Sequence, residues 1–369
     1  MLPYISLLLI PLSFQILSVF NYNSLRLKKT SIKFNRAILP LFFILFLLVL
    51  SLRNKYLGRD LVNYEHLFIK FGNSSLGSVF SSWSEIVYRF YCWFFYNHIS
   101  NNYQLFVSIT AILSVIPIMY VYCKDKTHGY LKIAIFVNMS TYVMLFSGIR
   151  QGLAMALGLL AYQTLKDKKY ILFILLSILA TFTHHTGFMV FLLFPLFFFR
   201  FKTKDLWWII SSIMTVFIFN KPIFNFLSSL AGSFNDKYGV QATETGAFMS
   251  FVLFALFATF CFLVEDEKTM DNDAYALRNI LVFAVVLQSF AFVNDLAMRM
   301  NYYFILLIPL AVGNAVKNAS KVNYQMAKIG ELVLSVFFTI YFVYAVYSSF
   351  KNGSGFLDTI PYVPFWKEI

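Results

Sequence analysis

Charged residues are scarce in this chain, and cysteines are scarcer still. Asp, Glu, Lys and Arg make up 13% of the 369 residues, whereas soluble domains carry about 25%. The three cysteines, Cys92, Cys123 and Cys261, lie far apart and show no CxxC or metal-binding spacing. The sequence therefore predicts neither a disulfide framework nor a zinc site.

Nucleotide-binding motifs are also missing. The chain contains no GxxxxGK[S/T] loop and no GxGxxG element, the two glycine-rich motifs that bind phosphates through backbone N–H groups at a helix N-terminus. We therefore expect no nucleotide cofactor, and we predict no cofactor of any other kind.

Apolar residues dominate the composition instead. Hydrophobic residues make up 59% of the chain, aromatic residues make up 20%, and the mean hydropathy is +0.70. These values are typical of a polytopic membrane protein in contact with lipid. The net charge of +13 is spread over short basic clusters between apolar segments, as the positive-inside rule predicts, so we expect no nucleic acid as partner.

Apolar runs near the roughly 20 residues that cross a bilayer predict an all-α fold with about twelve transmembrane helices. The first run lacks the charged start and cleavage site of a signal peptide, so we expect it to be retained as a span. The seventh and eighth runs are short, and Pro195 favours a broken or re-entrant element there. The runs are 2–20, 36–52, 103–123, 130–148, 151–166, 169–186, 187–200, 206–220, 246–264, 278–297, 300–316 and 329–349.

Basic residues predict the orientation. Arg26 to Arg36 place the first loop in the cytoplasm, and alternation then puts the later basic clusters on the same side. The single domain 1–369 would carry two extracytoplasmic loops, 53–102 after the second span and 221–245. Residues 86–99 are too short to span and rich in Tyr and Trp, so we predict an interfacial helix on the outer surface.

Residues 146–191 read as two apolar helices joined by the turn Lys166–Lys169. If the turn lies at one face of the bilayer, Arg150 before the first helix and His184–His185 after the second must lie at the opposite face. The extracytoplasmic side then gathers polar residues from segments far apart in the chain, namely Arg53, Asp60, Glu85, Arg150, His184, His185 and Arg299.

Arginines on that face are informative because snorkelling anchors favour the cytoplasmic side. A guanidinium offers a planar fork of donors that matches phosphate oxygens and keeps its charge at physiological pH. A lipid-linked pyrophosphate fits three such groups at the interface. A phospholipid headgroup or a teichoic-type polymer fits the same chemistry, so the residues alone leave these alternatives open.

Several short motifs resemble the EpsG family, which belongs with the Wzy-type polysaccharide and O-antigen polymerases. They are Arg53, Gly58, Asp60 and Tyr64 after the second span, Ile149–Arg150–Gln151, His184–His185–Thr186–Gly187, Arg299 with Tyr302 and Tyr303, and Pro361–Tyr362. The resemblance implies a GT-C-like membrane glycosyltransferase of the bacterial cytoplasmic (inner) membrane. Such an enzyme joins undecaprenyl-pyrophosphate-linked oligosaccharide repeats at the outer face, without a nucleotide sugar, beside a flippase and a chain-length regulator.

Roles follow from this reading as hypotheses. Asp60, His184 and His185 are the candidate general bases for the acceptor hydroxyl. Asp60 has an alternative role as the salt-bridge partner of Arg53. Adjacent helical residues point about 100° apart, which predicts that one imidazole faces the site and disfavours a metal. The candidate pyrophosphate ligands are Arg53, Arg150 and Arg299, and the further substrate contacts are Glu85, as a weaker candidate, with Gln151, Tyr64 and Tyr303.

Three other classes of protein remain as alternatives. A transporter or flippase would place ionisable residues near the bilayer midplane and show related halves, whereas here the charges lie at helix ends and no internal repeat is visible. A ligase that moves finished glycan would have a similar site. A polytopic acyltransferase is the third alternative, because a histidine beside Asp60 suits that chemistry.

Overall fold

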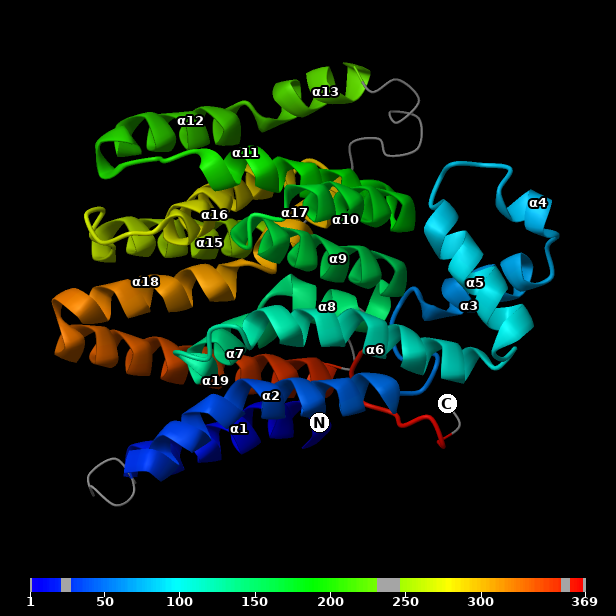
Figure 1. Cartoon of the computed structure of the whole chain (residues 1–369), viewed down its shortest axis with the longest axis horizontal. Helices are drawn as coiled ribbons and strands as arrows, with labels where there is room; N and C mark the ends of the chain where they lie inside the picture. The colour runs from blue at the N-terminus through cyan, green and yellow to red at the C-terminus, as the bar shows by residue number, and fades with distance from the viewer. Residues whose placement is uncertain (1, 21–27, 231–245, 353–358, 368–369) are drawn as a thin grey trace. The chain divides into compact units, whose positions relative to one another are not determined.

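The computed structural model describes residues 2–20, 28–230, 246–352 and 359–367. Within these ranges the regular secondary structure is helical, apart from one isolated antiparallel β-bridge between Arg53 and Pro364. The chain divides into two compact units, Met1–Val190 with Ile329–Ile369, and Phe191–Lys328. Figure 1 follows the helices in chain order. The all-α class predicted from the composition is confirmed.

The first unit contains both ends of the chain and most of the polar motifs. Two of its elements cross the boundaries of the unit: η2 ends two residues after Val190, and α19 begins five residues before Ile329. The elements are α1 (Leu2–Phe20), α2 (Lys28–Ser51), α3 (Leu61–Gly72), α4 (Leu76–Val79), α5 (Ile86–His98), α6 (Tyr103–Tyr122), α7 (Gly129–Val137), α8 (Ser140–Ser147), α9 (Ile149–Lys166), α10 (Tyr170–Thr183), η2 (His185–Leu192) and α19 (Tyr324–Asn352).

The second unit is built on α16, which contacts α11, α12, α15, α17 and α18. The buried guanidinium of Arg278 in α16 donates to the carbonyl oxygen of Phe201 and, at 3.3 Å, to Glu267. The elements are α11 (Leu193–Phe198), the 3-10 helix η3 (Thr203–Asp205), α12 (Leu206–Ile218), α13 (Asn220–Leu230), α15 (Gly246–Val264), α16 (Asn272–Phe290), α17 (Asp295–Ile305) and α18 (Ile308–Val322).

The membrane-spanning character is clear, but fewer helices pass a test of length and hydropathy than there are apolar runs in the sequence. In the described ranges four helices are long and apolar enough to span, or up to seven if each bent pair counts as one span. The pair formed by His185–Phe198 and Thr203–Ile218 bends by 116°, which agrees with the broken element predicted around Pro195. The chain is therefore an all-α polytopic membrane protein, and twelve crossings stay a prediction.

The predicted loop boundaries need two corrections. Residues 221–230 of the second predicted loop belong to α13 (Asn220–Leu230), and 231–245 lie outside the described residues. Helix α16 begins at Asn272, six residues before the predicted span at 278, because Asp271 caps it by accepting a hydrogen bond from the N–H of Ala274 at 2.8 Å.

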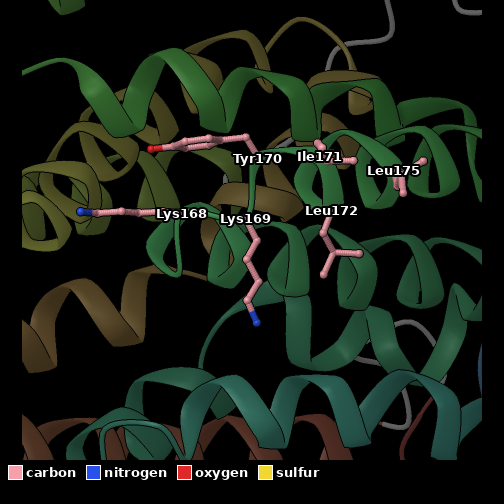
Figure 2. Close-up of a pocket in the computed structure, with 6 residues that line it drawn as sticks. All are labelled: Lys168, Lys169, Tyr170, Ile171, Leu172 and Leu175. Atoms are coloured by element: carbon pink, nitrogen blue, oxygen red, sulfur yellow. The ribbon is translucent and has the colours of Figure 1, made fainter.

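Helices α9 and α10 form the hairpin predicted from the sequence. They contact each other along their length and are joined by Asp167, Lys168 and Lys169. Lys168 adopts a left-handed backbone conformation (φ 57°), which lets the chain reverse within three residues. Figure 2 shows this turn beside a shallow pocket of about 460 Å³ lined by Lys168, Lys169, Tyr170, Ile171, Leu172 and Leu175.

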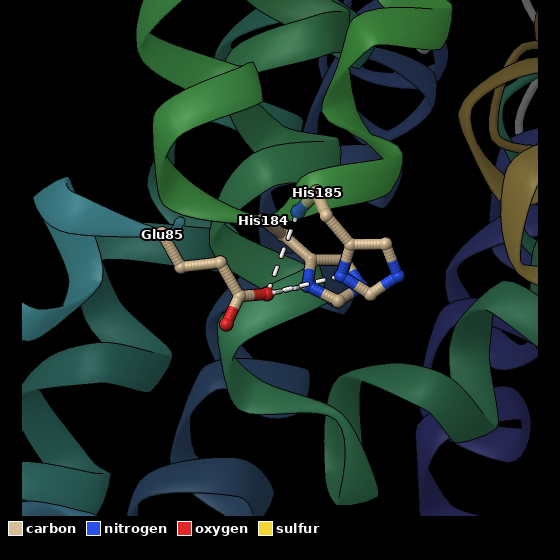
Figure 3. Close-up of side chains that lie close together, drawn as sticks. All are labelled: Glu85, His184 and His185. Carbon is tan, nitrogen blue, oxygen red and sulfur yellow. Dashed lines mark hydrogen bonds and ion pairs between the residues drawn. The ribbon is translucent and has the colours of Figure 1, made fainter. Parts of the chain in front are cut away.

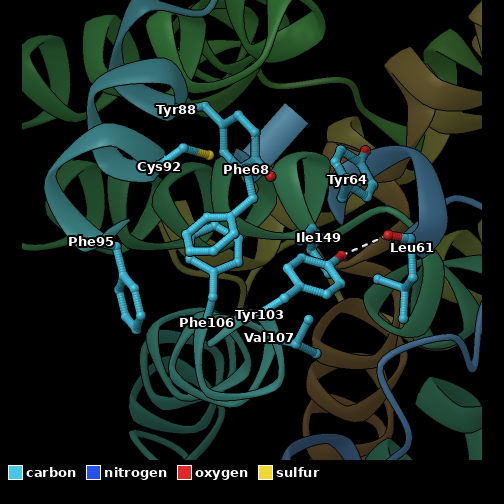
Figure 4. Packing of buried hydrophobic residues seen from close by; sticks show 10 residues of the cluster. All are labelled: Leu61, Tyr64, Phe68, Tyr88, Cys92, Phe95, Tyr103, Phe106, Val107 and Ile149. Atoms are coloured by element: carbon cyan, nitrogen blue, oxygen red, sulfur yellow. Dashed lines mark hydrogen bonds between the residues drawn. The ribbon is translucent and has the colours of Figure 1, made fainter. Parts of the chain in front are cut away.

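The loop predicted after the second span folds into α3, α4 and α5, which lie beside one end of α6 (Figure 1). The segment predicted as an interfacial helix, 86–99, is helical as α5, and its place at the membrane interface stays a prediction. An aromatic cluster joins α3, α5 and α6, with the rings of Phe68 and Phe106 4.5 Å apart. The hydroxyl of Tyr103 donates to the carbonyl oxygen of Leu61 at 2.7 Å (Figure 4). These contacts fix the position of α5, and with it the residue that precedes the helix.

The C-terminal tail pairs with the segment that leaves α2. The N–H of Asn54 donates to Val363 at 2.8 Å, and the N–H of Phe365 donates to Leu52 at 2.9 Å. Both bonds flank the Arg53–Pro364 bridge. The tail is therefore part of the first unit, close to the start of the segment 53–102, which we call the polar loop.

Candidate active site

Arg150 and the histidine pair lie at the same end of the α9–α10 hairpin. Arg150 is the second residue of α9, and His184 is the first residue after α10. Because the two helices are antiparallel and the turn between them is short, the start of one must lie beside the end of the other. Their common contact with Glu85 confirms that these residues come together, while the membrane face on which they lie stays a prediction.

Glu85 reaches this end of the hairpin from the residue before α5. It has a left-handed backbone conformation (φ 52°, ψ 36°), which is uncommon for a residue other than glycine and often marks a functional position. Its Oε1 lies 2.6 Å from Nδ1 of His184 and 3.1 Å from Nδ1 of His185 (Figure 3). Because an ionised carboxylate only accepts, each Nδ1 carries the proton and donates.

The other carboxylate oxygen, Oε2, forms an ion pair with the guanidinium of Arg150. The guanidinium carbon also lies 5.5 Å from the ring centre of Tyr64 and 5.7 Å from that of Tyr88, which is the range of cation–π contacts. We call Glu85, Arg150, His184 and His185 the Glu85 cluster. It joins α9, the end of α10 and the start of α5.

Burial and the neighbouring polar groups shift the pKa of Glu85 in opposite directions. Burial alone would raise the pKa of its carboxyl group, but the hydrogen bonds from both histidines and the charge of Arg150 outweigh it, so the pKa lies well below its usual range. The carboxylate therefore stays ionised at physiological pH. An ionised Glu85 fixes the Nδ1–H tautomer of both imidazoles and leaves Nε2 as the basic nitrogen.

The structure corrects the geometry expected for the histidine pair, while the prediction that one imidazole faces the substrate stays a prediction. The expected geometry assumed a helical histidine pair. His184 instead has an extended backbone (φ −147°, ψ 135°), so the 100° rotation between helical neighbours does not apply. The two rings lie 4.2 Å apart, centre to centre, and both contact Glu85.

The members of the cluster differ in exposure. The side chain of His184 is 2% exposed, whereas those of His185 and Arg150 are 27% and 22% exposed. Nε2 is buried in both histidines, and Nε2 of His184 has no hydrogen-bond partner among the described residues. A molecule that approaches from outside would therefore meet the exposed parts of His185 and Arg150.

The cluster has the donor set of a metal site, since one carboxylate and two imidazoles present ligand atoms within 4.8 Å of one another. This set suits zinc. Two observations argue against a metal. The guanidinium of Arg150 already pairs with the carboxylate. A metal-binding histidine normally donates its second ring N–H to an acceptor, and buried Nε2 of His184 has no such acceptor among the described residues. We therefore interpret the cluster as a hydrogen-bonded acid–base group.

Comparison with models of known protein families gives a match over most of the chain. The model of the EpsG family matches residues 36–363, which is most of the chain and includes every member of the Glu85 cluster. The chain belongs to the EpsG family. Members of this family are Wzy-type polysaccharide polymerases, so the resemblance seen in the sequence is confirmed. No curated protein and no solved structure matches the chain.

Gly187 explains one motif of this EpsG protein, His184–His185–Thr186–Gly187. A Cβ atom on Gly187 would overlap the backbone carbonyl of Ala180 in α10. Only glycine therefore lets the chain fold back so closely against the helix that carries the histidines. The last residue of the motif positions the first two.

Replacing Gly187 by alanine should displace the histidine pair. We expect Gly187→Ala to lower polymer formation in cells by about a hundredfold, because shifts near 1 Å at a reacting group have effects of this size. Gly330→Ala is the matched control, since a Cβ there meets nothing within 4 Å. Surface glycan measured at equal membrane levels checks this, and wild-type polymer from Gly187→Ala would contradict it.

Arg53, expected to bind pyrophosphate, is fully buried in the first unit. Its NH1 donates to the carbonyl oxygen of Leu145 at 3.4 Å, and its guanidinium lies 5.5 Å from the ring centre of Phe146. The alternative salt bridge with Asp60 is therefore wrong. The structure places Arg53 in the packing between α8 and the polar loop, and direct contact with a substrate is not supported.

Asp60 lies at the start of α3 and is not part of the Glu85 cluster. Its N–H donates to the hydroxyl of Ser147 at 3.2 Å, which ties the polar loop to α8. Gly58 makes this approach possible, because its φ of 133° suits glycine and a Cβ there would lie 2.7 Å from the carbonyl oxygen of Phe146. Gly58 and Asp60 of the sequence motif thus bring the backbone of the loop close to that of α8.

The remaining predicted residues fall into two groups. The ring of Tyr64 lies against Arg150, and Gln151, the residue after Arg150 in α9, is buried. Arg299 and Tyr303 belong to α17 of the second unit, where Tyr303 is buried and Arg299 is half-buried. Their part in substrate binding stays a prediction.

Sequence reasoning ranked Glu85 too low. It treated Glu85 as a weaker candidate, an interfacial carboxylate with its hydrogen bonds satisfied, whereas Glu85 contacts the three other members of the cluster. Tyr88, which contributes its ring to Arg150, was not among the predicted site residues. Both lie at the start of α5, and no spacing in the sequence links this helix to α9 or α10.

Proposed function

We propose that this EpsG protein joins oligosaccharide repeats linked to undecaprenyl pyrophosphate, at the outer face of the bacterial cytoplasmic membrane, within a GT-C-like helical architecture. The observation that carries the proposal is the division of the Glu85 carboxylate, which orients two histidines through Oε1 and pairs with Arg150 through Oε2. The histidines, as candidate bases, and Arg150, as a cation that can bind an anion, thus contact the same carboxylate. Glycosyl transfer from a pyrophosphate donor needs both.

The reaction would proceed as follows. A hydroxyl oxygen of the acceptor repeat attacks the anomeric carbon of the donor glycan. The new glycosidic bond forms as the bond between that carbon and the pyrophosphate oxygen breaks. The electron pair leaves with the lipid pyrophosphate, and the hydroxyl proton passes to a base of the protein. No nucleotide and no oxidation step is involved.

His185 is the best candidate for the base. Its side chain is 27% exposed, more than that of His184, although its Nε2 is buried. Glu85 fixes its tautomer so that Nε2 can accept the proton once binding brings the acceptor hydroxyl to it. His184 is almost fully buried and donates to the same oxygen at the shorter distance of 2.6 Å. We therefore assign His184 to positioning Glu85, and His185 to proton transfer.

Arg150 would bind the pyrophosphate. Its NH1 is paired with Glu85, and its Nε is buried without a hydrogen-bond partner among the described residues. The rest of the guanidinium fork suits a second anion, and a cation here would stabilise the charge that develops on the leaving pyrophosphate. Arg299 is proposed as a further ligand of the same group.

The two histidines test this division of roles. We expect His185→Ala to lower polymer formation by about 10²- to 10⁴-fold, the usual effect of losing a general base, while His184→Ala has a smaller effect of about tenfold through misplacement of Glu85. The assay is surface glycan length on a gel, in a deletion strain of the host complemented at matched membrane levels. Equal, mild effects of the two substitutions would contradict the assignment.

A further inference from the structure

A cavity separate from the Glu85 cluster opens elsewhere on the first unit. Its volume is about 980 Å³, at the upper end of the range for sites that bind small molecules. Its walls come from the end of α2, from α3, from the start of α6 and from the C-terminal tail. Four segments that are distant in the sequence thus build one concave surface.

Six of the fifteen lining residues are neutral and polar, and six are apolar or aromatic. Three of the fifteen lining residues are charged, and two of these, Lys55 and Glu65, form an ion pair with Nζ and Oε1 2.7 Å apart. The neutral polar lining residues are Ser51, Asn54, Asn101, Asn102, Gln104 and Ser108. Such a lining suits a ligand with many hydroxyl groups better than a phosphate, because amides and hydroxyls both donate and accept.

The walls are held in place by their own hydrogen bonds. Nδ2 of Asn54 donates to the carbonyl oxygen of Lys367 at 2.8 Å, and Nε2 of Gln104 donates to the carbonyl oxygen of Arg53 at 2.8 Å. Because these bonds join the tail, the polar loop and α6, the cavity exists before any ligand binds. A preformed site avoids the cost of ordering its walls.

Aromatic rings complete the surface. Tyr56 and Phe365, both among the lining residues, are 42% and 47% exposed. An exposed ring beside amides offers an apolar face to the C–H side of a sugar while the amides bind its hydroxyls. Neutral amides, hydroxyls and exposed rings together are the chemistry that recognises a carbohydrate.

The cavity shares a wall with the candidate active site. Glu65 of α3 lines the cavity, while its neighbour Tyr64 lies against Arg150. Tyr103 lines the cavity too, and it packs in the same aromatic cluster as Tyr64 and Tyr88. A glycan in the cavity would thus lie one layer of side chains from the Glu85 cluster.

We propose that this cavity binds the glycan part of a polymerase substrate, several sugar units long, away from the bond being formed. The inference rests on the proposed function, because it takes the ligand to be the oligosaccharide that the Glu85 cluster joins. Binding there would retain the glycan between successive additions or align an incoming repeat. The growing glycan and the incoming repeat have the same chemistry. They are told apart by the products that accumulate when binding is lost.

The test uses the deletion strain complemented with wild type, Tyr56→Ala, Asn101→Ala or the control Tyr347→Ala, whose parent side chain is 52% exposed on α19. At equal membrane levels we expect Tyr56→Ala and Asn101→Ala each to lower long-chain glycan by about two- to tenfold, as for loss of one stacking or hydrogen-bonding contact. Tyr347→Ala should match wild type.

The products identify the source of the glycan. Short oligomers accumulate if the cavity retains the growing chain, and single repeats accumulate if it aligns the incoming one. Chain lengths equal to the control for both Tyr56→Ala and Asn101→Ala would overturn the inference while leaving the polymerase intact. Long chains in the deletion strain itself would overturn both proposals, so the two failures are distinguishable.

Discussion

Glu85→Gln is expected to reduce polymer formation by about a hundredfold or more, the scale of losing acid–base catalysis, with little change in the amount of protein in the membrane. The substitution keeps the size of the side chain and removes its charge. An amide does not fix the tautomer of His185, and it leaves Arg150 without its ion-pair partner. Both functions of the cluster are lost in one step.

A second Glu–His pair in the same unit supplies the control. Oε2 of Glu331 lies 2.9 Å from Nδ1 of His128, so Glu331→Gln makes the same chemical change at a pair outside the candidate site. We expect Glu331→Gln to support wild-type chain lengths. Surface glycan resolved by length is the measurement, and equal polymer from Glu85→Gln and wild type would exclude Glu85 from the mechanism.

Arg150→Ala is expected to abolish long chains, with a loss of about 10²- to 10³-fold, the scale seen when one group that stabilises developing charge is removed. Its charge lies where a pyrophosphate would leave, and its ring contacts with Tyr64 and Tyr88 hold the guanidinium in place. Arg150→Lys keeps the charge but loses the planar fork. We therefore expect Arg150→Lys to recover only a small part of the activity.

The comparison between the two substitutions separates charge from geometry. Polymer from Arg150→Lys close to wild type would show that a positive charge suffices, and polymer from Arg150→Ala close to wild type would remove the arginine from the site. Arg200→Ala is a suitable control, because Arg200 is an exposed arginine of the second unit that donates to Asn272 at 2.7 Å. Chain length at matched membrane levels is again the measurement.

The hairpin that carries Arg150 and the histidines could be predicted from the sequence. Its two apolar runs have lengths fixed by the bilayer, and the basic turn 166–169 fixes which ends meet. Given those two facts, Arg150 and His184–His185 had to share a face. The lengths of the two apolar runs and the position of the basic turn were therefore enough to bring together three of the four members of the cluster.

Glu85 could not be ranked in the same way, because its position depends on a local exception to regular structure. A left-handed residue before α5 and an extended residue after α10 bring Glu85 and His184 together, and neither conformation follows from apolar spacing. The position of Arg53 was equally hidden. A single arginine at a span end reads as exposed, whereas its guanidinium is turned into the packing against Leu145 and Phe146.

The most direct test of the proposed chemistry uses the purified, membrane-reconstituted protein. Undecaprenyl-pyrophosphate-linked repeats isolated from the deletion strain would be supplied as the only substrate, without nucleotide sugar. We predict that wild type lengthens the glycan and releases one lipid pyrophosphate per new linkage, and that Glu85→Gln does neither at a comparable rate. No lengthening by the wild-type protein, or lengthening by Glu85→Gln at the wild-type rate, would contradict a polymerase that acts through the Glu85 cluster.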